Sequence, residues 1–417
     1  MRVSAKLPSL LLFIEVLLAS GPLRGEATLV EKLRDEGMEH YRARRYYQAL
    51  RSLETAFDAA GEGERPELKG LLARVHSAVG VELFNSGELR RSENAFRQAL
   101  TSAEDSYAHF GLGFLHFVRL EDAEAEEHLT QSIRLEPTHG KTHKLLALLD
   151  YRQGRTAQAI TKIAEAARLD PEDRETLALR DRWTLESRTT KAFTERTIGR
   201  FHLRIDPELP PARVDAVVKV LETARRDAME ILGLKASSRI VVVLFVEERF
   251  HKATGSYHWV GGMFDGQIKL PVRAREGDQA ARNELIFAVR HEMAHAAVRQ
   301  VCPECPNWLN EGIAQYFEDP ARRDSARKLL KEGAHQRIAF QQVPSRLWGV
   351  DDEALARWTY LQGLGFVEFL VARFQPFRLR LCLEALRGER SLEKAFEMAY
   401  GQSLEALEDL WWKEING

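Results

Sequence analysis

This sequence has few cysteines, a small net charge and few long apolar runs. Its 3 cysteines are too few to supply the four ligands of a thiolate zinc site. The net charge of −2 gives no indication of a nucleic-acid partner. The chain is nevertheless long: 417 residues, of which 44% are hydrophobic, predict a soluble globular protein with two or more domains.

The apolar stretch at the N-terminus is too short for an ordinary membrane span. Arg2 and Lys6 supply positive charge, residues 7–18 are mostly apolar, and small residues at 25 and 27 offer a cleavage site. We expect residues 1–27 to be a cleaved signal peptide, which implies an exported protein, periplasmic or extracellular. An uncleaved N-terminal anchor, which would be the only membrane association, and a cytosolic amphipathic start are the alternatives.

Residues 30–185 are expected to be helical and repetitive. Corresponding residues recur 34 positions apart, the period of tetratricopeptide repeats; the pairs are Gly113 with Ala147, Ala125 with Ala159, Leu129 with Ile163, Ser132 with Ala166 and Pro137 with Pro171. Two earlier units carry part of this pattern. Four units exceed the three that a stable stack needs, so we expect an all-α tetratricopeptide-like solenoid. Such a solenoid resembles protein-binding modules and offers no catalytic residues.

The pattern changes near residue 196. Residues 201–205 and 239–245 predict strands, and the segment between them predicts an amphipathic helix. Residues 266–272 follow a glycine-rich turn and predict a strand at the edge of the sheet. The chain from Asp319 onward is expected to be mostly helical.

A His-Glu-x-x-His motif occupies residues 291–295, within a segment expected to be helical from Asn283 to Arg299. Positions i and i+4 lie on one helix face, about 6 Å apart along the axis, so His291 and His295 can bind one zinc ion. Glu292 is then well placed to take a proton from a water at the metal. A surface helix with two solvated histidines is the alternative.

Glu311 follows His295 by sixteen positions. A short loop and a second helix starting near Trp308 would return its carboxylate to the metal. Two histidines and one glutamate, with water in the fourth position, form the ligand set of a catalytic zinc site. Gln315, four positions after Glu311, is expected to orient a ligand, with a surface role as the alternative. Gly312 leaves room for another helix to pack closely.

The His-Glu-x-x-His motif and the run Trp-Leu-Asn-Glu-Gly-Ile-Ala at 308–314 together resemble the gluzincin metallopeptidases, which include thermolysin and the zinc aminopeptidases. The sixteen-residue spacing is shorter than in those two and closer to bacterial peptidase MA-like domains. The resemblance implies an α+β fold with a small sheet and a mostly helical C-terminal lobe, a Zn²⁺ cofactor and peptide-bond hydrolysis. It also implies an edge strand that pairs with an extended substrate. Residues 266–272 are the candidate, with ordinary sheet as the alternative.

Two further features flank the motifs. Tyr360, three positions before Gly363, is similar to the Tyr-x-x-Gly of the zinc aminopeptidases, whose tyrosine donates to the oxyanion. The residues around it differ from that pattern, and a packed core tyrosine is the alternative. Cys302 and Cys305 lie between the two motifs, where they would either close a disulfide in an exported protein or simply pack. Cys382 is expected to be buried.

The sequence thus predicts three parts: a targeting segment at 1–27, a repeat domain at 30–185 and a zinc metallopeptidase domain at 196–417. Zinc held by His291, His295 and Glu311 would polarise water and the scissile carbonyl, with Glu292 as the base. The expected partners are a peptide or protein substrate and a protein bound by the repeats. A non-catalytic scaffold with a peptidase-like domain is the alternative function.

Overall fold

The structure is a computed structural model that describes residues 27–236, 239–255, 261–275, 279–333, 337–343, 353–388 and 391–416. The expected targeting segment lies outside these residues, except for Ala27. The chain divides into two compact units. One takes in the chain up to Leu149 together with Thr161–Thr176, and the other takes in Asp150–Ile160 together with Leu177–Gly417. Among the described residues, none of the helices has the length and apolar character that a membrane crossing requires.

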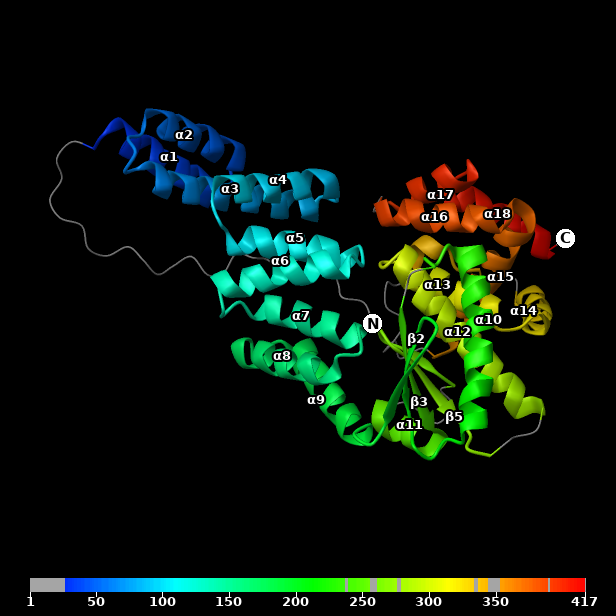
Figure 1. Ribbon diagram of the computed structural model, residues 1–417. Coiled ribbons are helices and arrows are strands. Elements are labelled where there is room, and N and C mark those ends of the chain that lie inside the picture. Colours follow the sequence, from blue (N-terminus) through cyan, green and yellow to red (C-terminus); the bar gives the residue numbers. More distant parts are fainter. Residues whose placement is uncertain are drawn as a thin grey trace. The chain divides into compact units, whose positions relative to one another are not determined.

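The first unit is built from α-helices that pack in consecutive pairs, α1 with α2, α3 with α4 and α5 with α6 (Figure 1). Their bounds are α1 Leu29–Arg42, α2 Tyr46–Ala59, α3 Arg65–Asn85, α4 Leu89–Ser102, α5 Ser106–Val118 and α6 Asp122–Leu135. Two more helices, α7 Gly140–Arg152 and α8 Thr156–Leu169, are shared between the two units.

Small residues lie where the helices of each pair meet. A Cβ added to Gly37 would lie 2.7 Å from Leu53 Cγ, and one added to Gly113 would lie 2.7 Å from Leu129 Cγ. The middle pair repeats the arrangement, since a Cβ on Gly80 would lie 2.6 Å from the Phe96 ring. In each case the glycine is sixteen positions before the large residue that fills its space. A side chain at any of these glycines would force the two helices apart.

The second unit combines a small mixed sheet with helices. Its strands are β1 Thr194–Ile198, β2 Phe201–Ile205, β3 Ile240–Val246, β4 Met263–Phe264 and β5 Ile268–Val272. Its helices are α9 Arg174–Thr189, α10 Pro211–Leu232, α11 Glu247–Thr254, α12 Gln279–Val301, α13 Asn307–Glu318, α14 Pro320–Glu332, α15 Glu353–Phe374, α16 Pro376–Gly388, α17 Leu392–Tyr400 and α18 Leu404–Asn416, with a 3₁₀ turn at Phe340–Gln342. The unit is therefore mostly helical.

The five strands lie in the order β1-β2-β3-β5-β4. β2, β3 and β5 are parallel, while β1 and β4 run antiparallel to their neighbours. The prediction that residues 266–272 form an edge strand is wrong in its position, because β5 lies between β3 and β4. The edge is β4, in which Met263 pairs with Lys269 and Phe264 with Ile268. Two residues are too few to show the alternation by which a strand is detected in a sequence.

β3 is buried along its whole length, because apolar residues cover both faces of the sheet. One face joins α10, α12 and the C-terminal helices in the large core, through Val242 and Leu244 of β3 and Ile268 and Leu270 of β5. The opposite face packs on α11 in a smaller cluster of Val243, Phe245, Phe250 and Ala253. In Figure 1, α10 and α12 lie on one side of the strands and α11 lies at their lower end.

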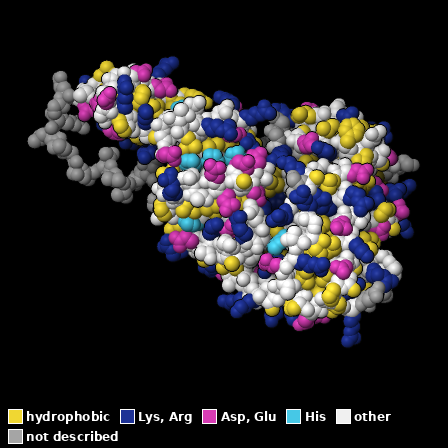
Figure 2. All heavy atoms as spheres, viewed as in Figure 1, with side chains coloured by type: hydrophobic (Ala, Val, Ile, Leu, Met, Phe, Trp, Pro, Cys, Tyr) yellow, Lys and Arg dark blue, Asp and Glu magenta, His cyan; other side chains and the backbone are white. Residues whose placement is uncertain are grey.

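Acidic and basic side chains both spread over the visible face of the molecule (Figure 2), as the near balance of 60 Lys and Arg against 62 Asp and Glu requires.

Candidate metal centre

Two histidines of α12 lie one helical turn apart on the same face. Their Nε2 atoms are 3.0 Å apart, and the rings meet nearly edge to face, at 85°. The helix positions them because its other residues around the motif are apolar and buried, namely Val289, Met293, Ala294, Ala296, Ala297 and Val298. The core thus fixes the rotation of α12 and leaves His291 and His295 facing outward from it together.

A carboxylate of α13 completes the group. α12 ends at Val301, and a turn closed by a 3.1 Å hydrogen bond from Cys305 N to Cys302 O leads into α13. Glu311 Oε2 then lies 3.7 Å from His291 Nε2, and Glu311 Oε1 lies 3.8 Å from His295 Nε2. Donors bound to one tetrahedral zinc ion are separated by roughly 3.3–3.6 Å. The observed separations of 3.0, 3.7 and 3.8 Å lie on either side of this range, so the three side chains could hold one metal ion.

The outer nitrogen of each imidazole is held by a hydrogen bond. His291 Nδ1 donates to Glu318 Oε1 at 2.7 Å, and His295 Nδ1 donates to Asn310 Oδ1 at 3.0 Å. The other oxygen of Glu318 accepts from the guanidinium of Arg322. Since a carboxylate or an amide oxygen accepts the hydrogen bond, each Nδ1 carries a proton, and in the neutral form of each imidazole the Nε2 lone pair is available for a metal.

Sequence reasoning missed both of these supporting residues. Glu318 lies seven positions after Glu311, and two helical turns bring such positions to the same face, so this spacing marks it as a candidate without showing that it meets an imidazole. Asn310 immediately precedes Glu311. Gln315 is half-buried, and no hydrogen bond joins it to Glu311 or to either imidazole among the described residues. Its orienting role therefore stays a prediction.

Glu292 is buried beside the two histidines. Burial, reinforced by the negative charges of Glu311 and Glu318, raises the pKa of Glu292 to about 7 although His291 opposes the shift. The backbone of Gly262, next to β4, lies against this carboxyl group: a Cβ there would be 2.8 Å from Glu292 Cγ. A carboxyl group with a pKa near neutrality can both accept and return a proton at physiological pH.

The two imidazoles respond differently to burial. Burial alone lowers the pKa of His291, but the hydrogen bond to Glu318 and the charges of Glu292 and Glu311 raise it to about 9 in the metal-free protein. The pKa of His295 is lowered, first by burial, with Glu311 and Asn310 acting against the shift. At neutral pH and without a metal, His291 is therefore protonated, and its positive charge lies where a bound metal ion would place its own.

Tyr360 lies on α15, which crosses α13 closely near Glu311. A Cβ on Gly312 would lie 2.5 Å from the carbonyl carbon of Gly363, and one on Gly363 would lie 2.4 Å from Trp308 O. The two backbones therefore touch. Glu311 precedes one glycine by one position, and Tyr360 precedes the other by one turn. Burial and the charge of Glu311 raise the pKa of Tyr360 to about 12, so its phenol stays protonated and can donate.

Three buried thiols lie near the loop between the motif helices. Cys302, Cys305 and Cys382 are buried, and none of the three is in a disulfide. Of the two alternatives for Cys302 and Cys305, the structure therefore shows packing. Burial, followed by the neighbouring Cys302, raises the pKa of the Cys382 thiol. The three thiols belong to the large core.

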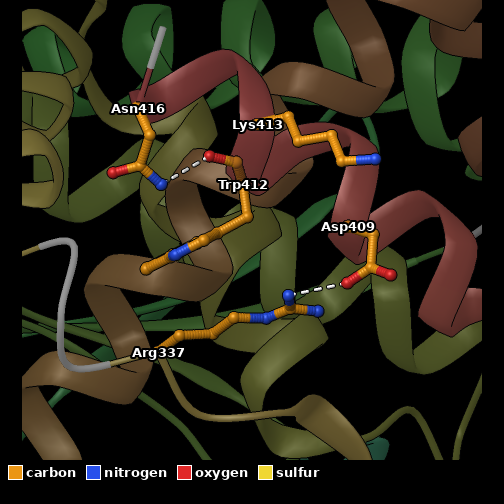
Figure 3. Close-up of a pocket in the computed structure, with 5 residues that line it drawn as sticks. All are labelled: Arg337, Asp409, Trp412, Lys413 and Asn416. Carbon is orange, nitrogen blue, oxygen red and sulfur yellow. Dashed lines mark hydrogen bonds and ion pairs between the residues drawn. The ribbon is translucent and has the colours of Figure 1, made fainter.

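A separate hollow of about 490 Å³ lies against α18 (Figure 3). It is lined by Arg337, Asp409, Trp412, Lys413 and Asn416. Arg337 Nη1 pairs with Asp409 Oδ1 at 2.7 Å, and Asn416 Nδ2 donates to Trp412 O at 2.8 Å. None of the three candidate zinc ligands lines it, and its main charges already neutralise each other.

Comparison with known proteins bears on the C-terminal third of the chain. The chain has no match among the curated proteins. Residues 277–417, which contain His291, Glu292, His295, Glu311 and Tyr360, match the family model described as the Peptidase MA superfamily.

Proposed function

We propose that this protein is a zinc-dependent metallopeptidase of the gluzincin type. The observation that carries the proposal is the convergence of His291, His295 and Glu311 on one point, within 4.8 Å of one another, inside the segment that matches the Peptidase MA superfamily. The buried Glu292 beside them supports a catalytic site over a structural one, because a structural zinc site has no use for a base.

Each side chain has a separate task in peptide hydrolysis. A zinc ion bound by the three ligands would act as a Lewis acid toward water and the scissile carbonyl. Glu292 takes the proton of the attacking water and delivers it to the leaving amine nitrogen. Tyr360 donates a hydrogen bond to the oxygen that becomes negatively charged. Glu318 and Asn310 hold the two imidazoles in the tautomer that binds zinc.

The outward side of β4 is the surface that best suits an extended substrate. β4 is the sheet edge on the side of α12, and Gly262 next to it touches Glu292. An extended peptide added to this edge would pass beside the base, in the manner of strand addition.

The decisive experiment measures two properties of the purified protein: its zinc content and its turnover of an unstructured peptide library. We expect about one zinc per chain and cleavage that stops on chelation and returns with added zinc. Bound zinc without cleavage would favour a non-catalytic scaffold. Absence of bound zinc in the folded protein would refute the proposal.

We further infer that the N-terminal helices are tetratricopeptide-like repeats that bind a protein partner. Support comes from the recurrence of one contact: Gly37 with Leu53, Gly80 with Phe96 and Gly113 with Leu129 each join a small residue to a large one sixteen positions later. Such repetition is what stacked copies of one helical hairpin require.

A further inference from the structure

A lysine is buried in the middle of the sheet. Lys269 of β5 is only 1% exposed. Its Nζ donates to Glu186 Oε2 at 2.5 Å, to Tyr151 OH at 2.6 Å and to Asp265 Oδ2 at 2.9 Å. The Tyr151 hydroxyl in turn donates to Glu186 at 2.7 Å. Two carboxylates and a hydroxyl thus surround one ammonium group, and we call these four residues the Lys269 cluster.

The cluster joins segments that are far apart in the sequence. Tyr151 ends α7, Glu186 lies in α9, and Asp265 follows β4. The Tyr151 ring stacks on Trp183 at 4.3 Å, and its carbonyl accepts a hydrogen bond from Gln267 Nε2. All of these residues belong to the second compact unit. Tyr151, which the sequence places in the repeat domain, therefore contacts the turn between β4 and β5.

A buried ion cluster needs a reason beyond stability, because well-packed apolar side chains would often serve as well. The polar cluster adds hydrogen bonds, which fix the position of the backbone and side chains that they join. Asp265 accepts from Lys269, Gln267 donates to Tyr151, and Gly266 between them has a φ of 115°, open only to glycine without strain. The turn between β4 and β5 is thereby held at both of its flanking side chains.

The turn is a short distance along the chain from Gly262, which lies against the candidate base Glu292. Asp265 directly follows β4, and Gly262 directly precedes it. A Cβ on Gly262 would lie 2.9 Å from Glu292 Oε1, so the backbone at this position bounds the space of the carboxylate. A displacement of the turn therefore moves both the edge strand β4 and the Gly262 backbone that lies beside Glu292.

We propose that Tyr151, Glu186 and Lys269 are positioning residues that hold β4 against Glu292, so that residues 150–152 of α7 and 177–189 of α9 form part of the catalytic unit. The proposal rests on the proposed peptidase function for its kinetic consequence. Its structural half, the immobilisation of β4 by Tyr151 and Glu186 through Lys269, stands independently of turnover.

The test uses the full-length protein with Tyr151→Phe, which keeps the ring and its stacking on Trp183 but removes the hydroxyl. The control is Asp150→Asn. Asp150 adjoins Tyr151, is 1% exposed and pairs with Arg155 at 2.6 Å, so this variant perturbs a buried ion pair of a residue that is not a member of the Lys269 cluster. Three quantities are measured: bound zinc, hydrogen exchange of the amides at 261–265, and kcat and KM for a peptide.

We expect Tyr151→Phe to retain its zinc, to exchange the amides at 261–265 at least several-fold faster and to lose about tenfold in kcat. Asp150→Asn should match the wild type within twofold in both exchange and kcat. Unchanged exchange in Tyr151→Phe, or an equal acceleration in Asp150→Asn, would overturn the proposal. Faster exchange with unchanged kcat would overturn the link to Glu292. A wild type without turnover would refute the peptidase function, and the exchange data would still decide whether the cluster holds β4.

Discussion

His291 Nδ1 lies 2.7 Å from Glu318 Oε1, two helical turns beyond the proposed ligand Glu311. One helix, α13, therefore supplies both a carboxylate for the metal and a carboxylate for the imidazole that binds it. Arg322, one turn further along, fixes Glu318 from the other side. Under the proposed function, the zinc affinity of the site therefore depends on Glu318, a residue that is not itself a metal ligand.

Glu318→Ala should weaken zinc binding about 10- to 100-fold, the usual cost of losing a partner of a metal-bound histidine. The physical reason is that His291 loses the acceptor that fixes its tautomer and ring orientation. Competition with a chelator of known affinity measures the effect. Glu332→Ala, at an exposed glutamate of α14, is the control and should leave the affinity unchanged. Equal affinities in the two variants would remove Glu318 from the site.

Glu292 is proposed as the base and Glu311 as a metal ligand, and two substitutions distinguish these roles. Glu311→Ala removes one of three protein ligands, so the protein should lose its zinc on dialysis. Glu292→Gln leaves the ligands intact, so it should keep about one zinc and bind peptides while hydrolysis falls by several orders of magnitude. Metal analysis beside peptide binding and turnover distinguishes them. The reverse pattern of metal retention would show that the two roles are exchanged.

Tyr360→Phe should lower kcat on the order of a hundredfold and leave zinc content and KM nearly unchanged. A donor that acts on the developing oxyanion contributes to the transition state more than to substrate binding. Steady-state kinetics provide the measurement. Tyr400→Phe is the control, because it removes a tyrosine hydroxyl in the same way. The Tyr400 hydroxyl is buried and has no hydrogen-bond partner among the described residues. A kcat equal in Tyr360→Phe and wild type would return Tyr360 to a packing role.

Zinc affinity should rise with pH up to about 9. In the metal-free protein the pKa of His291 is about 9, because the hydrogen bond to Glu318 and the nearby carboxylates outweigh burial. A metal-binding imidazole must be neutral, so below pH 9 each zinc ion displaces this proton and the affinity falls about tenfold per pH unit. Calorimetry in buffers of different ionisation enthalpy counts the released proton. Affinity that is flat between about pH 7 and pH 8.5 would contradict the assignment.

The parts of the site that depend on local geometry could be predicted from the sequence. His291 and His295 follow from helical periodicity alone, and the structure places their Nε2 atoms 3.0 Å apart. Asn310 and Glu318 could not be assigned in the same way, because the face of α13 that meets α12 is set by the contact of Gly312 with Gly363 on a third helix. The sequence suggests that Gly312 packs closely but does not identify its partner.

The sheet shows the same limit. The buried run of β3 is evident from its β-branched residues, whereas the edge position was assigned to β5 because β4 has only two residues. Lys269 is the least predictable residue: a lysine within a strand usually indicates solvent. Its partners Glu186 and Tyr151 are 83 and 118 positions away, beyond any local pattern.

The order in which the chain is synthesised gives this last separation a consequence for folding in the cell. A ribosome adds about 5–20 residues per second, so Lys269 follows Tyr151 by roughly 6 to 24 s. During that interval the ends of α7 and α9 exist without the strand against which they pack, and the acidic Glu186 has no ammonium partner in the sheet. Residues 150–160 should therefore reach their final state only after β5 has emerged, long after the helices that precede them.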